Sequence, residues 1–201
     1  GYRKIAILGS EQAWEQEQAE HIKSKFEELG GKVVSYELPP TDGDLRGEGL
    51  KIAASKPDAV ALPIYFQKAQ AAKRLREQGV KVPFYSVLID NFMIDAAQGA
   101  LEGTITISDV TPSKEFVEKY EKRFNQSPDF GSDTSYDTVK LIAQAMKATG
   151  STDATVLKSY LKKLKTYQGS SGRLTFDGKG GVLKKPKLTV VKEGKIVDYT
   201  D

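Results

Sequence analysis

The sequence predicts an α/β protein in which a parallel β-sheet is flanked by helices, followed by additional helices and a C-terminal β-hairpin. In the first half, short apolar runs alternate with helix-length amphipathic segments, which is the pattern of repeated βαβ units. After Ser108 the helical segments follow one another without strands, and near the end two strand-like runs flank Glu193-Gly194. This change of rhythm indicates two packing units rather than one uniform sheet.

The composition is that of a globular domain and excludes several classes of protein. The 201 residues are 39% hydrophobic and 28% charged, and 30 basic residues nearly balance 27 acidic ones. That balance argues against nucleic acid as a partner, because nucleic-acid-binding proteins usually show a basic stripe. The absence of cysteine excludes thiol nucleophiles, disulfides and zinc–thiolate sites. Since Tyr2-Arg3-Lys4 leads straight into strand-like sequence, we expect a mature form whose precursor has a signal peptide, or a natural start elsewhere.

The first half contains the strands and helices of the expected parallel sheet. Lys4–Leu8 is a short apolar run of the kind that is buried on both faces of such a sheet. The helix after it has an apolar stripe of Ala19, Ile22, Phe26 and Leu29 at helical spacing. The expected strands are Lys4–Leu8, Lys32–Leu38, Ala59–Ile64, Val82–Val87 and Thr104–Ser108, and the expected helices are Glu11–Leu29 with Ser10 as N-cap, a helix capped by Asp44 that reaches Ser55, and Phe66–Gln78.

Helices dominate the residues after Ser108, and a β-ribbon ends the chain. Thr111-Pro112 is expected to open a helix, because proline is favoured in the first helical turn. The remaining expected elements are helices over Ser132–Thr149 and Asp153–Lys165, an apolar stripe of Tyr136, Val139, Ile142 and Met146 on the first of these, a strand at Leu174–Phe176, a turn at Gly178–Gly181, and a hairpin of Leu188–Val191 and Lys195–Tyr199.

Little in the sequence points to catalysis. The only histidine, His21, lies off the apolar stripe of its helix, so we expect it to face water rather than a cleft. No glycine-rich nucleotide or dinucleotide motif follows a strand, and metal-ligand spacing is missing. We therefore predict a protein that is not an enzyme and that uses neither a cofactor nor a metal.

Aromatic residues gather just after the predicted strand ends. Trp14 lies one turn into the helix after the first strand, and Tyr65 and Phe66 directly follow the third strand. Tyr85 and Asp90 lie at or after the end of the fourth strand. Ligands of open α/β sheets bind beyond the carboxyl ends of the strands, so these residues predict a pocket with apolar walls and few polar anchors. The alternative is that Trp14 and Phe66 merely cover the edge of the sheet.

Several segments together carry a resemblance to a known family. In their order and spacing, the chain resembles the type I periplasmic solute-binding proteins of the branched-chain amino acid transporter class, which are Leu/Ile/Val-binding-protein-like. The resemblance covers almost the whole chain. The segments are Lys4-Ile5-Ala6-Ile7-Leu8, Gly30-Gly31-Lys32-Val33-Val34, Lys56-Pro57-Asp58-Ala59-Val60, Phe116-Val117-Glu118-Lys119-Tyr120, Tyr136-Asp137-Thr138-Val139-Lys140-Leu141 and Gly172-Arg173-Leu174-Thr175-Phe176-Asp177.

The resemblance implies a periplasmic binding protein type I fold, with two flavodoxin-like lobes that close on a ligand. Residues 1–109 plus 186–201 match lobe 2, the ligand-binding α/β domain, and residues 110–185 match the C-terminal portion of lobe 1. The N-terminal half of lobe 1 has no counterpart. Without it the apolar stripe within 112–165 is left bare, at a cost of several kcal/mol at about 25 cal/mol per Å². We therefore expect a fragment made by proteolysis or by design, an oligomer, or a partner chain that covers these residues.

The resemblance also implies site residues, with one departure from the family pattern. Trp14 and Tyr65 match the aromatic residues that contact ligand in the family. The acid that binds the ligand's ammonium group falls on Leu88, and Asp90 two residues later is the expected substitute. If Asp90 does not substitute, the ligand is an aromatic acid, amide or other small organic molecule rather than an α-amino acid. The carboxylate site of the family lies largely in the half-lobe without a counterpart.

The function implied by the resemblance is binding without chemistry. The chain is expected to be the substrate-binding component of an ABC-type importer, holding an amino acid or related small organic acid between two lobes and docking on a membrane permease. The implied location is periplasmic or extracellular, with a lipid anchor in a Gram-positive host. Two alternatives stay open: a ligand-sensing module of a receptor or regulator, and an enzyme on a flavodoxin-like sheet, for which the nucleotide or flavin loop is missing.

Overall fold

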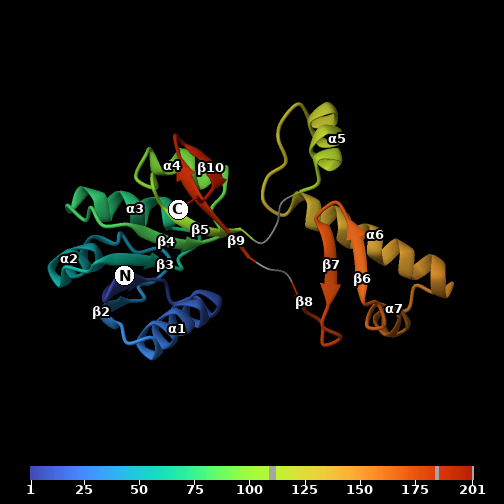
Figure 1. Cartoon of the computed structure of the whole chain (residues 1–201), viewed down its shortest axis with the longest axis horizontal. Coiled ribbons are helices and arrows are strands. Elements are labelled where there is room, and N and C mark those ends of the chain that lie inside the picture. Colours follow the sequence, from blue (N-terminus) through green and yellow to red (C-terminus); the bar gives the residue numbers. More distant parts are fainter. Residues whose placement is uncertain (109–111, 184–185, 201) are drawn as a thin grey trace. The chain divides into compact units, whose positions relative to one another are not determined.

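The computed structural model describes residues 1–108, 112–183 and 186–200. The chain forms two compact units, which we call the first unit (residues 1–108 and 187–201) and the second unit (residues 109–186) (Figure 1). The correspondence of these units to two lobes of a longer protein stays a prediction, and the predicted boundary positions 109, 110 and 185 lie outside the described residues.

The first unit contains a seven-stranded sheet in the order β10-β9-β5-β4-β3-β1-β2. Neighbouring strands from β1 to β5 pair in parallel, whereas β9 pairs antiparallel to β5 and to β10. The elements are β1 (Lys4–Leu8), α1 (Ala13–Glu28), β2 (Lys32–Glu37), α2 (Arg46–Ser55), β3 (Ala59–Leu62), α3 (Lys68–Glu77), β4 (Phe84–Val87), α4 (Asn91–Ala97), β5 (Ile105–Ser108), β9 (Lys187–Lys192) and β10 (Lys195–Asp198).

Helices cover both faces of this sheet, and each face has its own core. On one face, the buried Leu8, Leu62 and Phe84 pack in a cluster with Ile52 of α2 and Leu75 of α3. On the other face, α1 packs Ala19, with Ile22 and Phe26, against Ile5 and Ile7 of β1. The predicted α/β fold with a parallel-dominated sheet between helices is therefore confirmed.

The first helix differs in detail from the prediction. It begins at Ala13 with Gln12 as N-cap, so Ser10 is not the cap; its hydroxyl instead accepts a hydrogen bond of 3.2 Å from the Gln12 N–H. Leu29 is 69% exposed, because it lies past the last helical turn and the chain then reverses at Gly30 with φ of 84°. The predicted exposure of His21 is confirmed.

Two further differences concern the loops after the strands. α3 begins at Lys68, two residues later than predicted, so Phe66 lies in the loop after β3. α4 was not predicted, since its seven residues are short for a helix and follow strand-like sequence. The prediction that Asp44 is the N-cap of α2 is wrong, because the N-cap is Leu45; Asp44 lies one residue earlier, and its carboxylate accepts a hydrogen bond of 2.9 Å from the backbone N–H of Arg46.

The second unit packs three helices with a small antiparallel sheet of order β6-β7-β8. The prediction for Ser132–Thr149 is confirmed residue for residue, whereas β6 was not predicted. The helix expected to open at Thr111-Pro112 begins at Lys114 behind a Ser113 cap, and Thr111 lies outside the described residues. The elements are α5 (Lys114–Phe124), α6 (Ser132–Thr149), α7 (Ala154–Leu161), β6 (Thr166–Gly169), β7 (Gly172–Phe176) and β8 (Val182–Leu183).

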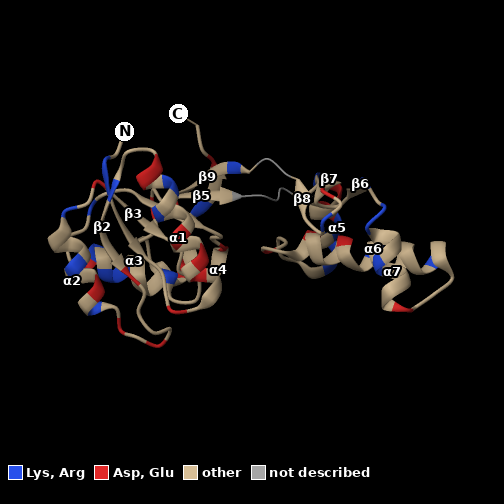
Figure 2. Ribbon diagram, turned by 90° about the horizontal axis from the view of Figure 1, so that it is seen from below, with Lys and Arg blue, Asp and Glu red and all other residues tan. Residues whose placement is uncertain are grey.

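The apolar stripe of α6 is exposed. Tyr136 and Val139 are 50% and 67% exposed, and Ile142 and Met146 also face solvent. In Figure 2 the ribbon of α6 is mostly tan, because it carries few charged residues. A helix in a monomeric globular domain usually buries such a stripe.

Candidate ligand-binding site

The loops that carry the predicted site residues follow three neighbouring strands. β4, β3 and β1 lie side by side and run parallel, so their carboxyl ends meet at one edge of the sheet. The loop after β1 leads to Trp14, the loop after β3 holds Tyr65 and Phe66, and the loop after β4 holds Leu88 and Asp90. Topology therefore places these segments where open α/β sheets bind ligands.

Trp14 and Tyr65 are connected through Glu15. Trp14 is the second residue of α1 and is 43% exposed, whereas the side chain of Glu15 beside it is buried. Glu15 Oε1 accepts a hydrogen bond of 2.8 Å from the backbone N–H of Tyr65. This contact fixes the start of α1 to the loop after β3, and with it the two aromatic residues that these segments carry.

Phe66 faces a different groove. Its ring is 74% exposed and meets the half-buried ring of Tyr65 edge-on, with 5.3 Å between the centroids. Phe66 and Phe92 line a cavity of about 480 Å³ between α3 and α4. Among the described residues that line this cavity, Trp14 and Tyr65 are absent. The structure thus groups Phe66 with α4 as well as with Tyr65, and its predicted role in ligand binding stays a prediction.

Lys68, which sequence reasoning missed, joins α3 to the loop after β4. Its side chain is fully buried, and its Nζ donates hydrogen bonds to the carbonyl oxygens of Val87 and Leu88. Burial lowers the pKa of Lys68 from 10.5 to about 7, against the smaller raising effect of the nearby carboxylates of Asp90 and Glu15. The sequence did contain a sign that both side chains are buried, because Glu15 and Lys68 each lie at helical spacing from the apolar residues of their own helix.

Leu88 and Asp90 have defined structural roles in the loop after β4. Leu88 adopts φ of 53°, in the left-handed region that is uncommon for residues other than glycine. Asp90 is the N-cap of α4, and its side chain accepts a hydrogen bond of 2.7 Å from the backbone N–H of Met93. The backbone therefore already engages one oxygen of the proposed ammonium-binding carboxylate. The binding roles of both residues stay predictions.

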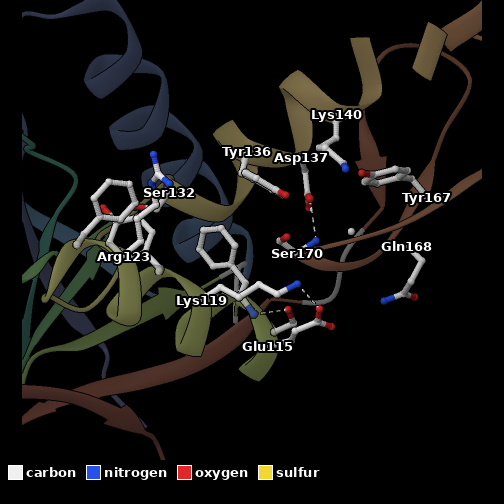
Figure 3. A pocket seen from close by; sticks show the side chains of 15 residues that line it. Glu115, Lys119, Arg123, Ser132, Tyr136, Asp137, Lys140, Tyr167, Gln168 and Ser170 are labelled. Carbon is white, nitrogen blue, oxygen red and sulfur yellow. Dashed lines mark hydrogen bonds and ion pairs between the residues drawn. The ribbon is translucent and has the colours of Figure 1, made fainter. Parts of the chain in front are cut away.

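The second unit contains a larger cavity of about 790 Å³. Figure 3 shows Glu115 and Lys119 of α5 on one side of it and Tyr136 and Lys140 of α6 on another. The walls are rich in aromatic rings, and the rim carries both cations and carboxylates. The rings that line it are Phe116, Tyr120, Phe124, Tyr136 and Tyr167. This cavity adjoins the exposed apolar stripe of α6. We therefore interpret it as part of an apolar surface that another segment or chain normally covers.

Asp137 closes one wall of this cavity and has a structural function. Its buried carboxylate accepts a hydrogen bond of 2.7 Å from the backbone N–H of Ser170 (Figure 3). It also accepts hydrogen bonds from the backbone N–H of Ser171, at 2.8 Å, and from the Ser171 hydroxyl. A Cβ added to Gly169 would lie 2.2 Å from Asp137 Oδ2, which shows how closely the turn approaches. These contacts join α6 to the turn between β6 and β7.

The described residues hold no group of three or more histidine, cysteine or acidic side chains that is arranged to hold a metal ion. In the same part of the chain, every helix is too short or too polar to cross a bilayer.

Comparison with known proteins identifies the family. The model of the periplasmic binding protein family matches residues 1–192. The chain belongs to this family. Among curated relatives, Leu/Ile/Val-binding protein homolog 1 of Brucella suis biovar 1 (strain 1330) is 27% identical over 194 residues, which cover 92% of this chain and 51% of the relative. The chain therefore spans about half the length of the curated relatives it matches.

Solved structures agree with the fold. A leucine-binding protein from Thermotoga maritima MSB8 has a TM-score of 0.89 at 22% identity, covering 100% of this chain and 60% of that one. A solute-binding protein of an ABC transporter from R. palustris, in complex with benzoate, has a TM-score of 0.85 at 21% identity, covering 98% of this chain and 58% of that one. Together with the family match, these findings confirm the type I fold and the resemblance to the branched-chain amino acid transporter class.

Proposed function

We propose that the chain is the ligand-binding part of a solute-binding protein that captures a small organic molecule for an ABC-type importer. The observation that supports this most is the convergence of the loops carrying Trp14, Tyr65 and Leu88 at one sheet edge, held by buried charged side chains. In the whole protein, ligand held between two lobes shifts the hinge equilibrium toward closure by its differential affinity for the closed form. No bond in the ligand is made or broken.

The ligand that we propose is a small carboxylic acid or amide with an apolar or aromatic body. Leu88 stands where the resemblance places an ammonium-binding acid, and the nearby Asp90 already caps α4. Both facts favour a ligand without an ammonium group. The benzoate complex of the relative from R. palustris supports this class, whereas the curated relatives named for leucine, isoleucine and valine support an amino acid as second candidate.

Titration of the intact protein tests the proposal. Leucine and isoleucine represent one ligand class, and benzoate and 3,4-dihydroxybenzoate represent the other. Isothermal titration calorimetry gives the affinities, and the fluorescence of Trp14, the only tryptophan, reports whether binding reaches the proposed edge. We expect the benzoates to bind more tightly than the amino acids. Absence of binding by both classes would argue against the proposed function.

The partners and location follow from the same proposal. A permease of an ABC-type importer is the expected receiver of the ligand, and a position outside the cytoplasmic membrane, with a lipid anchor, suits that task. A sensing role in a receptor or regulator uses the same fold. Transport measurements in cells that lack the gene distinguish the two roles, because only an importer component limits uptake.

A further inference from the structure

Two buried charged side chains connect the three loops at the carboxyl edge of the sheet. Within the described residues, Glu15 is the one buried glutamate and Lys68 the one buried lysine. Full burial of such side chains is uncommon unless they are paired, because removal of a charge from water is costly. Lys68 Nζ and Glu15 Oε1 both bond to backbone groups of the loops that carry the candidate site, whereas Glu15 Oε2 is buried without a hydrogen-bond partner among the described residues.

We propose that Glu15 and Lys68 are positioning residues for ligand recognition: Glu15 sets the Trp14 and Tyr65 segments relative to each other, and Lys68 fixes the segment that carries Leu88. This inference rests on the proposed function. It assigns a role in ligand binding to Glu15 and Lys68, which the resemblance to the family did not identify.

Glu15 acts at the start of α1. The N-cap residue of this helix, Gln12, makes no side-chain capping hydrogen bond, so the first turn lacks the usual local anchor. The contact from Glu15 Oε1 to the Tyr65 N–H supplies a tertiary anchor across 50 residues of sequence. Tyr65 donates this hydrogen bond itself, and Trp14 is the residue next to Glu15, so a shift in the contact moves both rings.

Lys68 acts at the end of β4. Its two hydrogen bonds satisfy consecutive carbonyl groups, of which the second belongs to Leu88 in the left-handed conformation. That conformation is unfavourable for a residue with a Cβ, and the bonds from Lys68 help to offset its cost. Asp90 holds the other end of the loop by capping α4. The loop from Val87 to Asp90 is thus held at both ends.

The hydrogen bonds from Lys68 to the carbonyl groups of Val87 and Leu88 do not depend on whether the Lys68 side chain is protonated. Glu15 of α1 and Asp90 at the start of α4 face the ammonium group, and the ring of Tyr65 lies 5.8 Å from Nζ. With a pKa of about 7, Lys68 is neutral in part of the population near pH 7. A neutral amine keeps two N–H donors, so both carbonyl contacts persist on deprotonation.

Substitutions on α3 and α1 test the proposal in the whole chain. K68M removes the donors at similar volume, and K73M is the matched control, since Lys73 is on the same helix and donates to Gln98 on the surface. E15A removes the acceptor for the Tyr65 N–H, whereas E15Q keeps an acceptor oxygen at the same length. We measure amide hydrogen exchange without ligand, and affinity by titration.

The expected result is a local loss of order together with a loss of affinity. K68M is expected to speed exchange of the amides from Leu88 to Ile94 and to weaken ligand binding by about tenfold or more, which equals about 1.4 kcal/mol. K73M changes neither quantity. E15A speeds exchange of the Tyr65 amide and weakens binding, and E15Q restores both toward the wild-type values.

Two results would overturn the inference. One is wild-type exchange rates in these loops for K68M and E15A. The other is faster exchange with unchanged affinity, which would assign both residues to stability alone. If the wild-type protein binds no ligand of either class, the proposed function fails. The exchange rates then still show whether Glu15 and Lys68 hold the loops at the carboxyl edge of the sheet in place.

Discussion

The carboxylate of Asp90 accepts a hydrogen bond of 2.7 Å from the backbone N–H of Met93, and so caps α4 at the edge of the candidate site. An aspartate at this edge has two possible uses, as a helix cap and as an anchor for a ligand's ammonium group. The two uses predict different responses to substitution.

D90A is expected to lower the free energy of unfolding by about 1 kcal/mol, because the cap is lost. D90N keeps a capping oxygen and is expected to leave stability unchanged. For a ligand without an ammonium group, D90N also leaves the affinity unchanged. Urea unfolding and calorimetric titration measure the two effects; a fall of about tenfold or more in leucine affinity for D90N would show that the carboxylate binds the ammonium.

W14A and Y65A are each expected to weaken ligand binding by about 1–3 kcal/mol, because aromatic walls supply much of the contact area in small-molecule sites. F66A is the comparison variant, since Phe66 lines the groove between α3 and α4. We expect F66A to bind as the wild type does. Unchanged affinity in both W14A and Y65A would show that the ligand binds elsewhere.

The stability of the first unit should depend on pH through Lys68. Its pKa is about 7 in the folded chain, below the usual 10.5, so the unfolded state binds more protons between these values. The contribution of Lys68 to the free energy of unfolding therefore increases as pH rises from about 7 toward 10.5, by roughly 4 kcal/mol. K68M lacks this gain and K73M retains it. Urea unfolding at about pH 6.5 and about pH 9.5 checks the difference.

D137A is expected to destabilise the second unit by about 3 kcal/mol, because it leaves the N–H groups of Ser170 and Ser171 without their acceptor. D153A, which removes the exposed cap of α7, provides a control with an expected cost of about 1 kcal/mol. Thermal unfolding followed by circular dichroism gives both values. Equal effects of the two substitutions would contradict the structural role assigned to Asp137.

The exposed stripe of α6 should make the isolated chain self-associate. Replacement of Val139 by lysine places a charge in the centre of the stripe, and we expect it to shift the chain toward monomer without loss of stability. Lysine in place of Thr138, which is exposed on the same helix, is the control. Sedimentation velocity measures the change in oligomeric state. A wild-type chain that is monomeric with ordered helices would contradict the prediction that another chain covers the stripe of α6.

The parts of the fold that the sequence predicted well are those with strong local signals. The hairpin is an example: Glu193 and Gly194 both adopt positive φ, of 52° and 70°, as a tight turn between strands requires. The long amphipathic α6 is another. By contrast, α4 is too short to give a clear helical pattern, and its apolar run Phe92-Met93-Ile94 is equally compatible with a strand.

The candidate site was predictable only in part, because its key contacts are non-local. Sheet topology brings the segments that carry Trp14 and Tyr65 to one edge, whereas the binding roles of these residues stay predictions. Charged residues are ordinarily taken as solvent-exposed, so Glu15 and Lys68 were passed over, although Ala19 and Ala72 lie four residues after them on the same buried faces. The capping role of Asp90 depended on α4, which had not been predicted.

The pairing of β9 with β5 has a consequence for synthesis of the chain. β5 obtains its second neighbour only when residues 187–192 have been made, after the entire second unit has left the ribosome. Until then one edge of β5 stays unpaired, and unpaired edges are sites where other chains add. The first unit is thus completed only after the second unit has been made, although β1 to β5 precede it in sequence, and a nascent chain stalled before residue 187 leaves this edge open to other chains.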